Sequence, residues 1–170
     1  MIAASSIARY FLTFSVPEQE SGITNLKLQK LLYYAQGLHL GTQKQPLFED
    51  TMEAWRHGPV VPSVYQDYKH HGSGFIPRPD DVLETELPGH VRDLLNSVYA
   101  VYGQYEAWKL AEMTHNEAPW REAVNRAFNA PLSLAVMEDF FATESLRING
   151  YTKDDVAPAD PEFVAWWNSL

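Results

Sequence analysis

Three residues near predicted turns could carry acid–base chemistry. His57 directly precedes a Gly-Pro dipeptide, and His115 and Glu117 occur together in the segment THNEAPW. Imidazole titrates near neutral pH and is a frequent general base. These residues define a catalytic alternative, a small hydrolase. We favour a structural role for all three, because a general base needs a positioned partner, and because turn packing and helix-end contacts account for residues of these types at such places.

Motifs for metal or cofactor chemistry are missing from the sequence. There is no cysteine, no HExxH spacing, no GxSxG elbow, no P-loop and no GxGxxG phosphate cradle. His70 and His71 are adjacent, so on a helix they point about 100° apart and cannot share one ion. The sequence therefore predicts no metal, no cofactor and no enzymatic activity.

The charge of the chain indicates the kind of partner it can bind. The 170 residues carry a net charge of −9, and the 13 lysines and arginines are scattered. This balance disfavours direct contact with nucleic acid and favours a basic protein partner. No apolar run is long enough to cross a bilayer. We expect a cytoplasmic protein, since nothing in the sequence requires an oxidising compartment.

Helical periodicity recurs along nearly the whole chain. It predicts a mainly α fold, a compact bundle of about seven helices with a short C-terminal helix and one short extended segment near 51–56. The expected helices cover about 4–12, 26–40, 62–68, 88–102, 105–115, 119–128, 134–141 and 162–170. Residues 1–143 are expected to form the main domain, and 144–170 a C-terminal extension packed on it.

Several local features refine this prediction. The helix over 26–40 should be central, with Leu31 and Leu32 in the core and Gly41 as its stop. Gly58 and the proline after it should form a turn. Further along the chain, Phe128 should share the buried side of its helix.

A mixed basic and aromatic strip is expected on the outer face of the second helix. Lys27, Lys30 and Tyr34 are spaced i, i+3 and i+7, opposite the leucines, and such a strip suits a protein interface. The alternative is an ordinary solvated helix surface. A tryptophan pair near the C-terminus could meet a partner or a second copy of the chain, because adjacent residues on a helix cannot both point inward. The candidate partner-binding residues are Lys27, Lys30, Tyr34, Trp55, Arg56, Tyr65, Trp166 and Trp167.

Three unusual segments occur in fixed order along the chain. They are LKLQKLLYYAQGLHL at 26–40, AWRHGPVVPSVY at 54–65 and MTHNEAPW at 113–120. As an ordered set they resemble the Panacea antitoxin domain, the family of phage-associated GepA-like and SocA-like proteins. The resemblance extends from about Ile7 to about Phe141 and covers most of the chain.

The resemblance implies an antitoxin that neutralises a cognate protein toxin by binding it directly, with no chemistry of its own. A second mechanism within the resemblance is a SocA-like adaptor that delivers the toxin to a bacterial protease, although we identify no separate protease-docking motif. Some relatives carry an appended DNA-binding module and regulate transcription. We identify no such module in this sequence, and its acidic balance argues against DNA contact.

Overall fold

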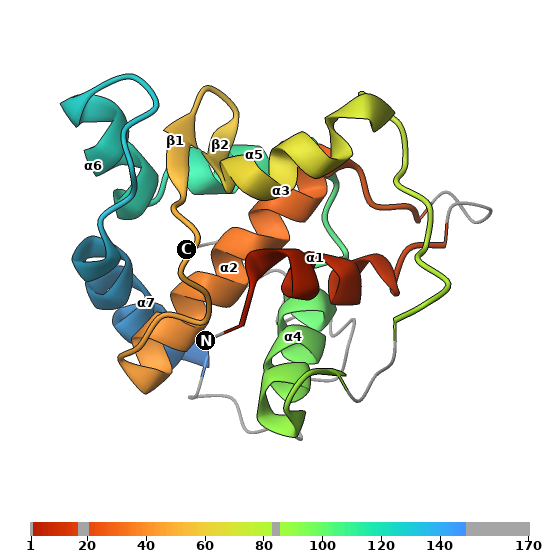
Figure 1. Cartoon of the computed structure of the whole chain (residues 1–170). Coiled ribbons are helices and arrows are strands. Elements are labelled where there is room, and N and C mark those ends of the chain that lie inside the picture. The colour runs from red at the N-terminus through yellow and green to blue at the C-terminus, as the bar shows by residue number, and fades with distance from the viewer. Residues whose placement is uncertain (1, 17–20, 83–85, 149–170) are drawn as a thin grey trace.

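A computed structural model describes residues 2–16, 21–82 and 86–148 (Figure 1). Within these ranges the chain forms seven α-helices, one short 3₁₀ helix and one two-stranded hairpin, which confirms the predicted mainly α fold. The elements in chain order are α1 (Ala4–Leu12), α2 (Asn25–Gln43), β1 (Glu53–Trp55), β2 (Gly58–Val60), α3 (Pro62–Tyr68), η2 (Lys69–His71), α4 (Gly89–Tyr102), α5 (Ala107–His115), α6 (Ala118–Arg126) and α7 (Leu134–Ile148).

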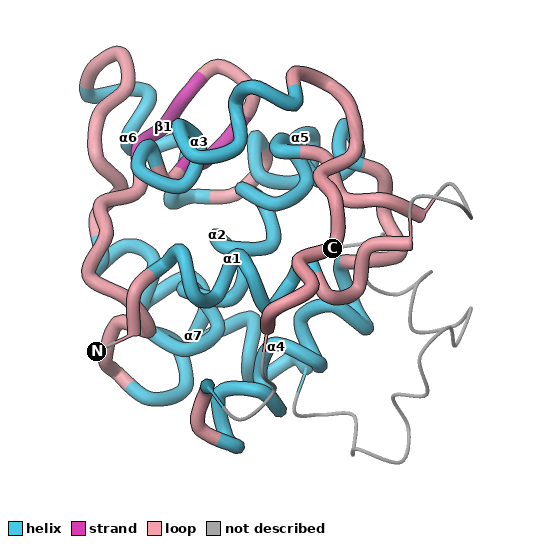
Figure 2. Tube along the Cα trace, turned by 45° about the vertical axis from the view of Figure 1, so that its right-hand side comes forward, coloured by secondary structure: helices cyan, strands magenta, loops and turns pink. Residues whose placement is uncertain are grey.

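Helix α2 is the centre of the molecule, as predicted. Its first turn is capped by Thr24, whose hydroxyl oxygen accepts from the Lys27 N–H at 3.2 Å. Figure 1 shows α2 crossing the middle of the molecule, and Figure 2 shows the hairpin, α3, α5 and α6 gathered at its upper end. Leu31 and Leu32 are fully buried. Because α1, α3, α4, α5, α7 and β2 all pack against α2, it has no continuous solvent face.

The predicted stop at Gly41 is wrong, because α2 continues to Gln43 and Lys44 caps it with a φ of +59°. Gly41 instead allows close approach of α7. A Cβ atom added at this glycine would lie 2.5 Å from the backbone carbonyl carbon of Phe141, and one added at Gly37 would lie 2.1 Å from the phenyl ring of the same residue. The two glycines therefore serve helix packing, and the chain needs no break there.

The turn of the hairpin also lies elsewhere than predicted. Arg56 and His57 form it, and Gly58 and Pro59 belong to strand β2. The strands are antiparallel, with Trp55 opposite Gly58. Gly58 has a φ of +102°, a conformation that glycine adopts without the steric cost met by other residues. The predicted turn is therefore displaced by two residues, and the glycine is needed at the start of strand β2, directly after the turn.

Helix α6 ends earlier than its apolar pattern suggests. It stops at Arg126, and Phe128 is 87% exposed, so the predicted burial of this phenylalanine is wrong. The chain leaves the helix to run beside strand β1, where the Ala54 N–H donates to the Ala130 carbonyl at 2.9 Å. This backbone hydrogen bond satisfies polar groups at the open edge of the hairpin. Because the helix has already ended, the following segment can reach that edge.

The C-terminal part is described up to Ile148, the last residue of α7. The helix therefore extends past Thr143, where the periodic pattern predicted its end. Trp166, Trp167 and the predicted helix over 162–170 lie outside the described residues. Within the part of the chain that the structure describes, none of the helices combines the length and apolar character needed to cross a bilayer.

Candidate partner-binding site

The three unusual sequence segments meet at one place, where α2, the hairpin and the α5–α6 turn come together. His115 stacks on Trp120 with ring centroids 4.1 Å apart and makes a hydrogen bond to the backbone of Arg56. The Trp120 indole N–H donates to the Trp55 carbonyl at 2.9 Å. We call this region the motif corner, which consists of Lys30, Tyr33, Tyr34, Gly58, Thr114, His115, Glu117 and Trp120.

A buried lysine joins α2 to strand β2 at the motif corner. Lys30 has no exposed surface, and its Nζ donates to the Pro59 carbonyl at 2.9 Å. Burial lowers the pKa of Lys30 to about 7. A Cβ atom on Gly58 would lie 2.6 Å from both Lys30 Cε and Thr114 Oγ1. Glycine at this position therefore leaves the space that the lysine side chain occupies.

A half-buried glutamate joins the start of α6 to α2. The two carboxylate oxygens of Glu117 accept from the Tyr33 and Tyr34 hydroxyls at 2.7 and 2.8 Å. Burial raises the pKa of Glu117 to about 8, and the two tyrosine hydrogen bonds oppose that rise. Tyr34 also stacks on Tyr102, with centroids 3.7 Å apart. The side chain is thus held among aromatic rings, where a protonated carboxyl costs less than a charged one.

These contacts correct the expected outer strip of α2. Lys30 and Tyr34 are fully buried, so their predicted place on the outer face is wrong. The physical reason is that α2 is enclosed on all sides, and polar groups within it are buried with hydrogen-bond partners. Their role in binding a partner stays a prediction, and it requires the corner to open. Lys27 is the one member of the strip that keeps partial exposure.

Three other predicted residues come together on the face of the hairpin. Trp55 and Tyr65 are half-buried, with ring centroids 4.9 Å apart, and Arg56 is exposed at the turn. The Trp55 indole N–H donates to the Glu53 carboxylate at 2.7 Å. The backbone behind this face is fixed by the contacts to His115 and Trp120 described above. We call Trp55, Arg56 and Tyr65 the hairpin face.

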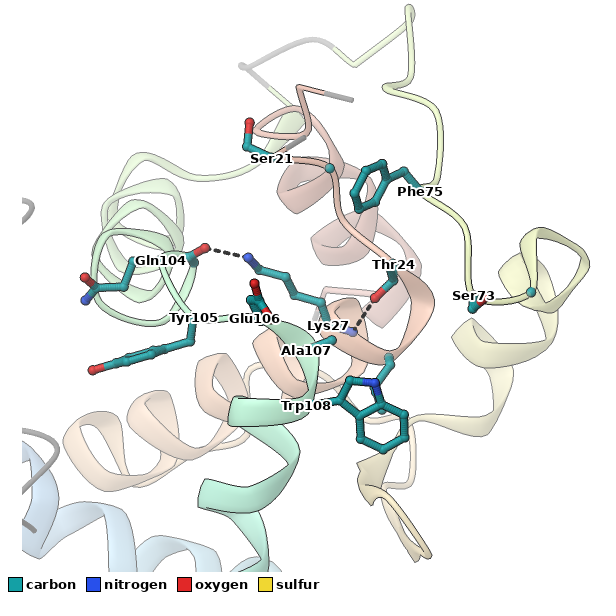
Figure 3. Close-up of a pocket in the computed structure, with 14 residues that line it drawn as sticks. Ser21, Thr24, Lys27, Ser73, Phe75, Gln104, Tyr105, Glu106, Ala107 and Trp108 are labelled. Carbon is teal, nitrogen blue, oxygen red and sulfur yellow. Dashed lines mark hydrogen bonds between the residues drawn. The ribbon is translucent and has the colours of Figure 1, made fainter. Parts of the chain in front are cut away.

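A separate groove, lined in part by the first turn of α2, is shown in Figure 3. It has a volume of about 560 Å³ and is formed by the start of α2, the loop after η2 and the segment between α4 and α5. Lys27 lines it and donates from Nζ to the Gly103 carbonyl at 2.5 Å. Burial lowers the pKa of Lys27, and the carboxylate of Glu106 partly offsets this. Trp108, 63% exposed, and Phe75, 43% exposed, also line the groove.

Sequence reasoning missed Trp108 and Phe75 as surface residues. The pattern of α5 gave no clear signal for the tryptophan, because Trp108 lies three residues before the buried Ala111, a spacing that puts both on nearly the same side of the helix. Phe75 follows a Gly-Ser-Gly segment and has no periodic context. Its position depends on a bridge to Thr24 that only the folded chain reveals.

The residues of the catalytic alternative do not assemble into a catalytic unit. The Glu117 carboxylate accepts from two tyrosines, and His115 is stacked on a tryptophan. His57 lies on the surface with its ring 4.9 Å from that of Trp108. No hydrogen bond joins any two of these three side chains. In the described part of the chain there is also no group of three or more side chains placed to hold a metal ion.

Comparisons with known proteins support the predicted resemblance. The family described as "Antitoxin SocA-like, Panacea domain" matches residues 28–121, which is more than half of the chain and includes every residue of the motif corner. Antitoxin SocA of Caulobacter vibrioides (strain NA1000 / CB15N) is 46% identical over 54 residues, which cover 32% of this chain and 29% of that protein. The matched region thus spans less than a third of the relative. No solved structure matches the chain.

Proposed function

Because the chain belongs to the SocA-like Panacea antitoxin family, we propose that it is an antitoxin that neutralises a cognate protein toxin by binding it directly. The observation that carries the proposal is what the three family segments form in the folded chain. They build a corner of buried and half-buried side chains that are hydrogen-bonded to each other or to backbone, and the three candidate catalytic side chains are not hydrogen-bonded to one another. Such a scaffold suits binding by a preformed surface. A protein that acts by covering another macromolecule needs an interface and slow release, and no reacting group.

The hairpin face is the surface that we propose for the toxin. It combines an exposed arginine with two half-buried aromatic rings, the residue types that most often carry the binding energy of protein interfaces. The Trp120 indole N–H fixes the backbone carbonyl of Trp55 from behind, and His115 lies against the backbone of Arg56. Little conformational freedom would be lost on binding, which favours affinity.

The proposal is tested by co-expression with the protein encoded in the adjacent reading frame. We expect that protein to stop growth alone and the present chain to restore growth, with a purified complex measurable by calorimetry. Arg56→Ala should weaken the complex by about tenfold or more, as for a hot-spot arginine. The matched control is Arg78→Ala, another exposed arginine on a distant loop. Unrestored growth with the wild-type chain contradicts the antitoxin function, and equal affinities of the two variants contradict the hairpin face.

The same cells distinguish occlusion from delivery to a protease. Direct binding leaves the amount of toxin unchanged while growth recovers. An adaptor lowers the toxin level, and a protease-deficient strain restores it. We propose occlusion, because the described surface already offers a rigid binding face. A toxin that disappears in step with recovered growth would favour the adaptor.

The catalytic alternative has its own test. His57 is exposed, so His57→Ala should leave stability nearly unchanged. Under the proposed function this variant still forms a complex with the toxin, with at most the loss of affinity expected for one interface contact, and at high expression it still neutralises the toxin. Under the hydrolase alternative it does not. His115 and Glu117 are poor choices for this test, since changes there would disturb the motif corner.

A further inference from the structure

The groove exposes two large aromatic side chains that no part of the proposed function has used. Figure 3 shows Phe75 and Trp108 on opposite sides of Thr24 and Lys27. The indole is 63% exposed and the phenyl ring 43% exposed. Exposed apolar side chains that line one concave surface are a common feature of binding sites. The volume of about 560 Å³ lies within the range of binding pockets and accommodates a few side chains.

The walls of the groove are already fixed in shape. Phe75 packs on Gly22, where an added Cβ atom would lie 2.2 Å from the phenyl ring. The Ile76 N–H donates to the Ile23 carbonyl at 2.8 Å, and Thr24 forms a β-bridge with Phe75. A preformed groove loses little conformational entropy when a ligand enters. It is therefore a better candidate for recognition than a surface that must first become ordered.

The charges around the groove favour a cationic ligand. Among the residues that line it, Lys27 and Glu106 carry charge. The lysine Nζ is directed at the Gly103 carbonyl, whereas Glu106 is exposed. Lys109, the next cation along α5, is paired with Glu112 at 3.3 Å. Since the whole chain has a net charge of −9, an exposed carboxylate and an exposed indole that line the same groove favour a positively charged ligand.

We propose that this groove binds an extended, arginine-bearing segment of the protein partner, with a guanidinium over Trp108 beside Glu106 and an apolar neighbour against Phe75. A guanidinium stacks on an indole face more readily than an ammonium group does and also suits a carboxylate. The inference rests on the proposed function, because it supplies the toxin as the source of the segment. It adds a second contact surface to the hairpin face, and His57, in contact with Trp108, lies between the two.

The first test uses the full chain and a defined probe. The probe is a capped seven-residue peptide with two arginines and one leucine, and its control replaces both arginines with citrulline, which has the same shape without the charge. We expect the Trp108 indole N–H signal, assigned in ¹⁵N spectra with Trp108→Phe, to shift on titration with the arginine peptide. Citrulline should weaken binding by about fivefold. Equal binding of both peptides, or no shift of the Trp108 signal, overturns the proposal.

Matched variants locate the charge. Glu106→Gln should weaken the arginine peptide by several fold, whereas Glu112→Gln, one acid further along α5 and already paired with Lys109, should not. A similar loss in both variants would mean a diffuse effect of net charge, and it overturns the groove as the specific site. Both acids are exposed, so neither variant is expected to unfold the chain.

Co-expression separates failure of this inference from failure of the proposed function. Trp108→Ala should reduce neutralisation of the toxin where the wild-type chain restores growth. Full neutralisation by Trp108→Ala overturns the groove as a toxin contact and leaves the antitoxin function standing. A wild-type chain that never neutralises the toxin overturns the proposed function, and the toxin as source of the segment falls with it. The peptide titration then decides by itself whether the groove takes a cationic segment.

Discussion

The motif corner and the groove use the same residue types in opposite ways. At the corner a lysine and two tyrosines are fully buried, a glutamate is half-buried, and all four are hydrogen-bonded to each other or to backbone. At the groove a lysine, a glutamate and two aromatic rings remain wholly or partly accessible. We infer from this difference that the three segments recognisable in the sequence serve mainly to stabilise the fold. The surfaces that we propose for a partner include residues with no recognisable sequence pattern.

The largest loss of stability is expected when Lys30, the buried lysine of the motif corner, is replaced by an acid. Lys30→Glu places a carboxylate against the Pro59 carbonyl at a fully buried position, so we expect a loss of stability of about 3–5 kcal/mol. Lys30→Met has a similar length and no charge, and it should cost much less. Urea unfolding at neutral pH measures both. Near-equal midpoints for Lys30→Glu and wild type would contradict the burial of Lys30.

A second break tests the glycine that makes room for this lysine. Gly58→Ala introduces a methyl group against Lys30 and Thr114 at a positive φ, which should cost about 2–4 kcal/mol. Gly72→Ala is the matched control, because Gly72 also has a positive φ, of +57°, but nothing lies within 4 Å of its added Cβ. The control should lose about 1 kcal/mol from backbone strain alone. Equal thermal shifts would show that packing at the corner is loose.

The stability of the motif corner should depend on pH because of Glu117. The pKa of Glu117 rises from the ordinary 4.5 to about 8 on folding, so the folded chain keeps a proton that the unfolded chain releases. Its contribution is complete below about pH 4.5 and is lost as the pH rises toward 8. Relative to Glu117→Gln, the wild-type chain should therefore lose on the order of 2 kcal/mol across this window.

Lys30 has the opposite slope, because its lowered pKa removes stability as the pH falls from about 10.5 to about 7. It is present in both proteins, so its contribution cancels in the difference between wild type and Glu117→Gln. Unfolding midpoints measured at several pH values provide the test. A constant difference between the two proteins would mean that the Glu117 carboxylate is not enclosed.

The smallest effect on stability is expected at the groove. Trp108→Ala removes a largely exposed ring, and we expect a change of about 0.5 kcal/mol or less. A change of several kcal/mol in the unfolding midpoint would make Trp108 a core residue and would remove the contrast between corner and groove. For binding of the partner we expect the opposite ranking. Trp108→Ala should weaken the complex although it hardly changes the free energy of unfolding.

The local sequence was sufficient to predict the class of the fold, its helices and part of its core. Helical periodicity identified the helices, because it depends only on the spacing of apolar residues along the chain. Leu31 and Leu32 were placed in the core correctly. The three ordered segments also predicted the family to which the chain belongs. All of these inferences depend on residues close together in the chain.

The tertiary structure alone decided which polar residues are buried. Lys30 and Tyr34 have the spacing of a surface strip, and only the packing of five helices and a strand around α2 encloses them. Gly41 resembles a helix stop until α7 lies against it. Periodicity specifies which residues share one side of a helix, but it carries no information on how many sides the rest of the chain will cover. That number depends on long-range contacts, and here it separates a buried lysine at the corner from an accessible one in the groove.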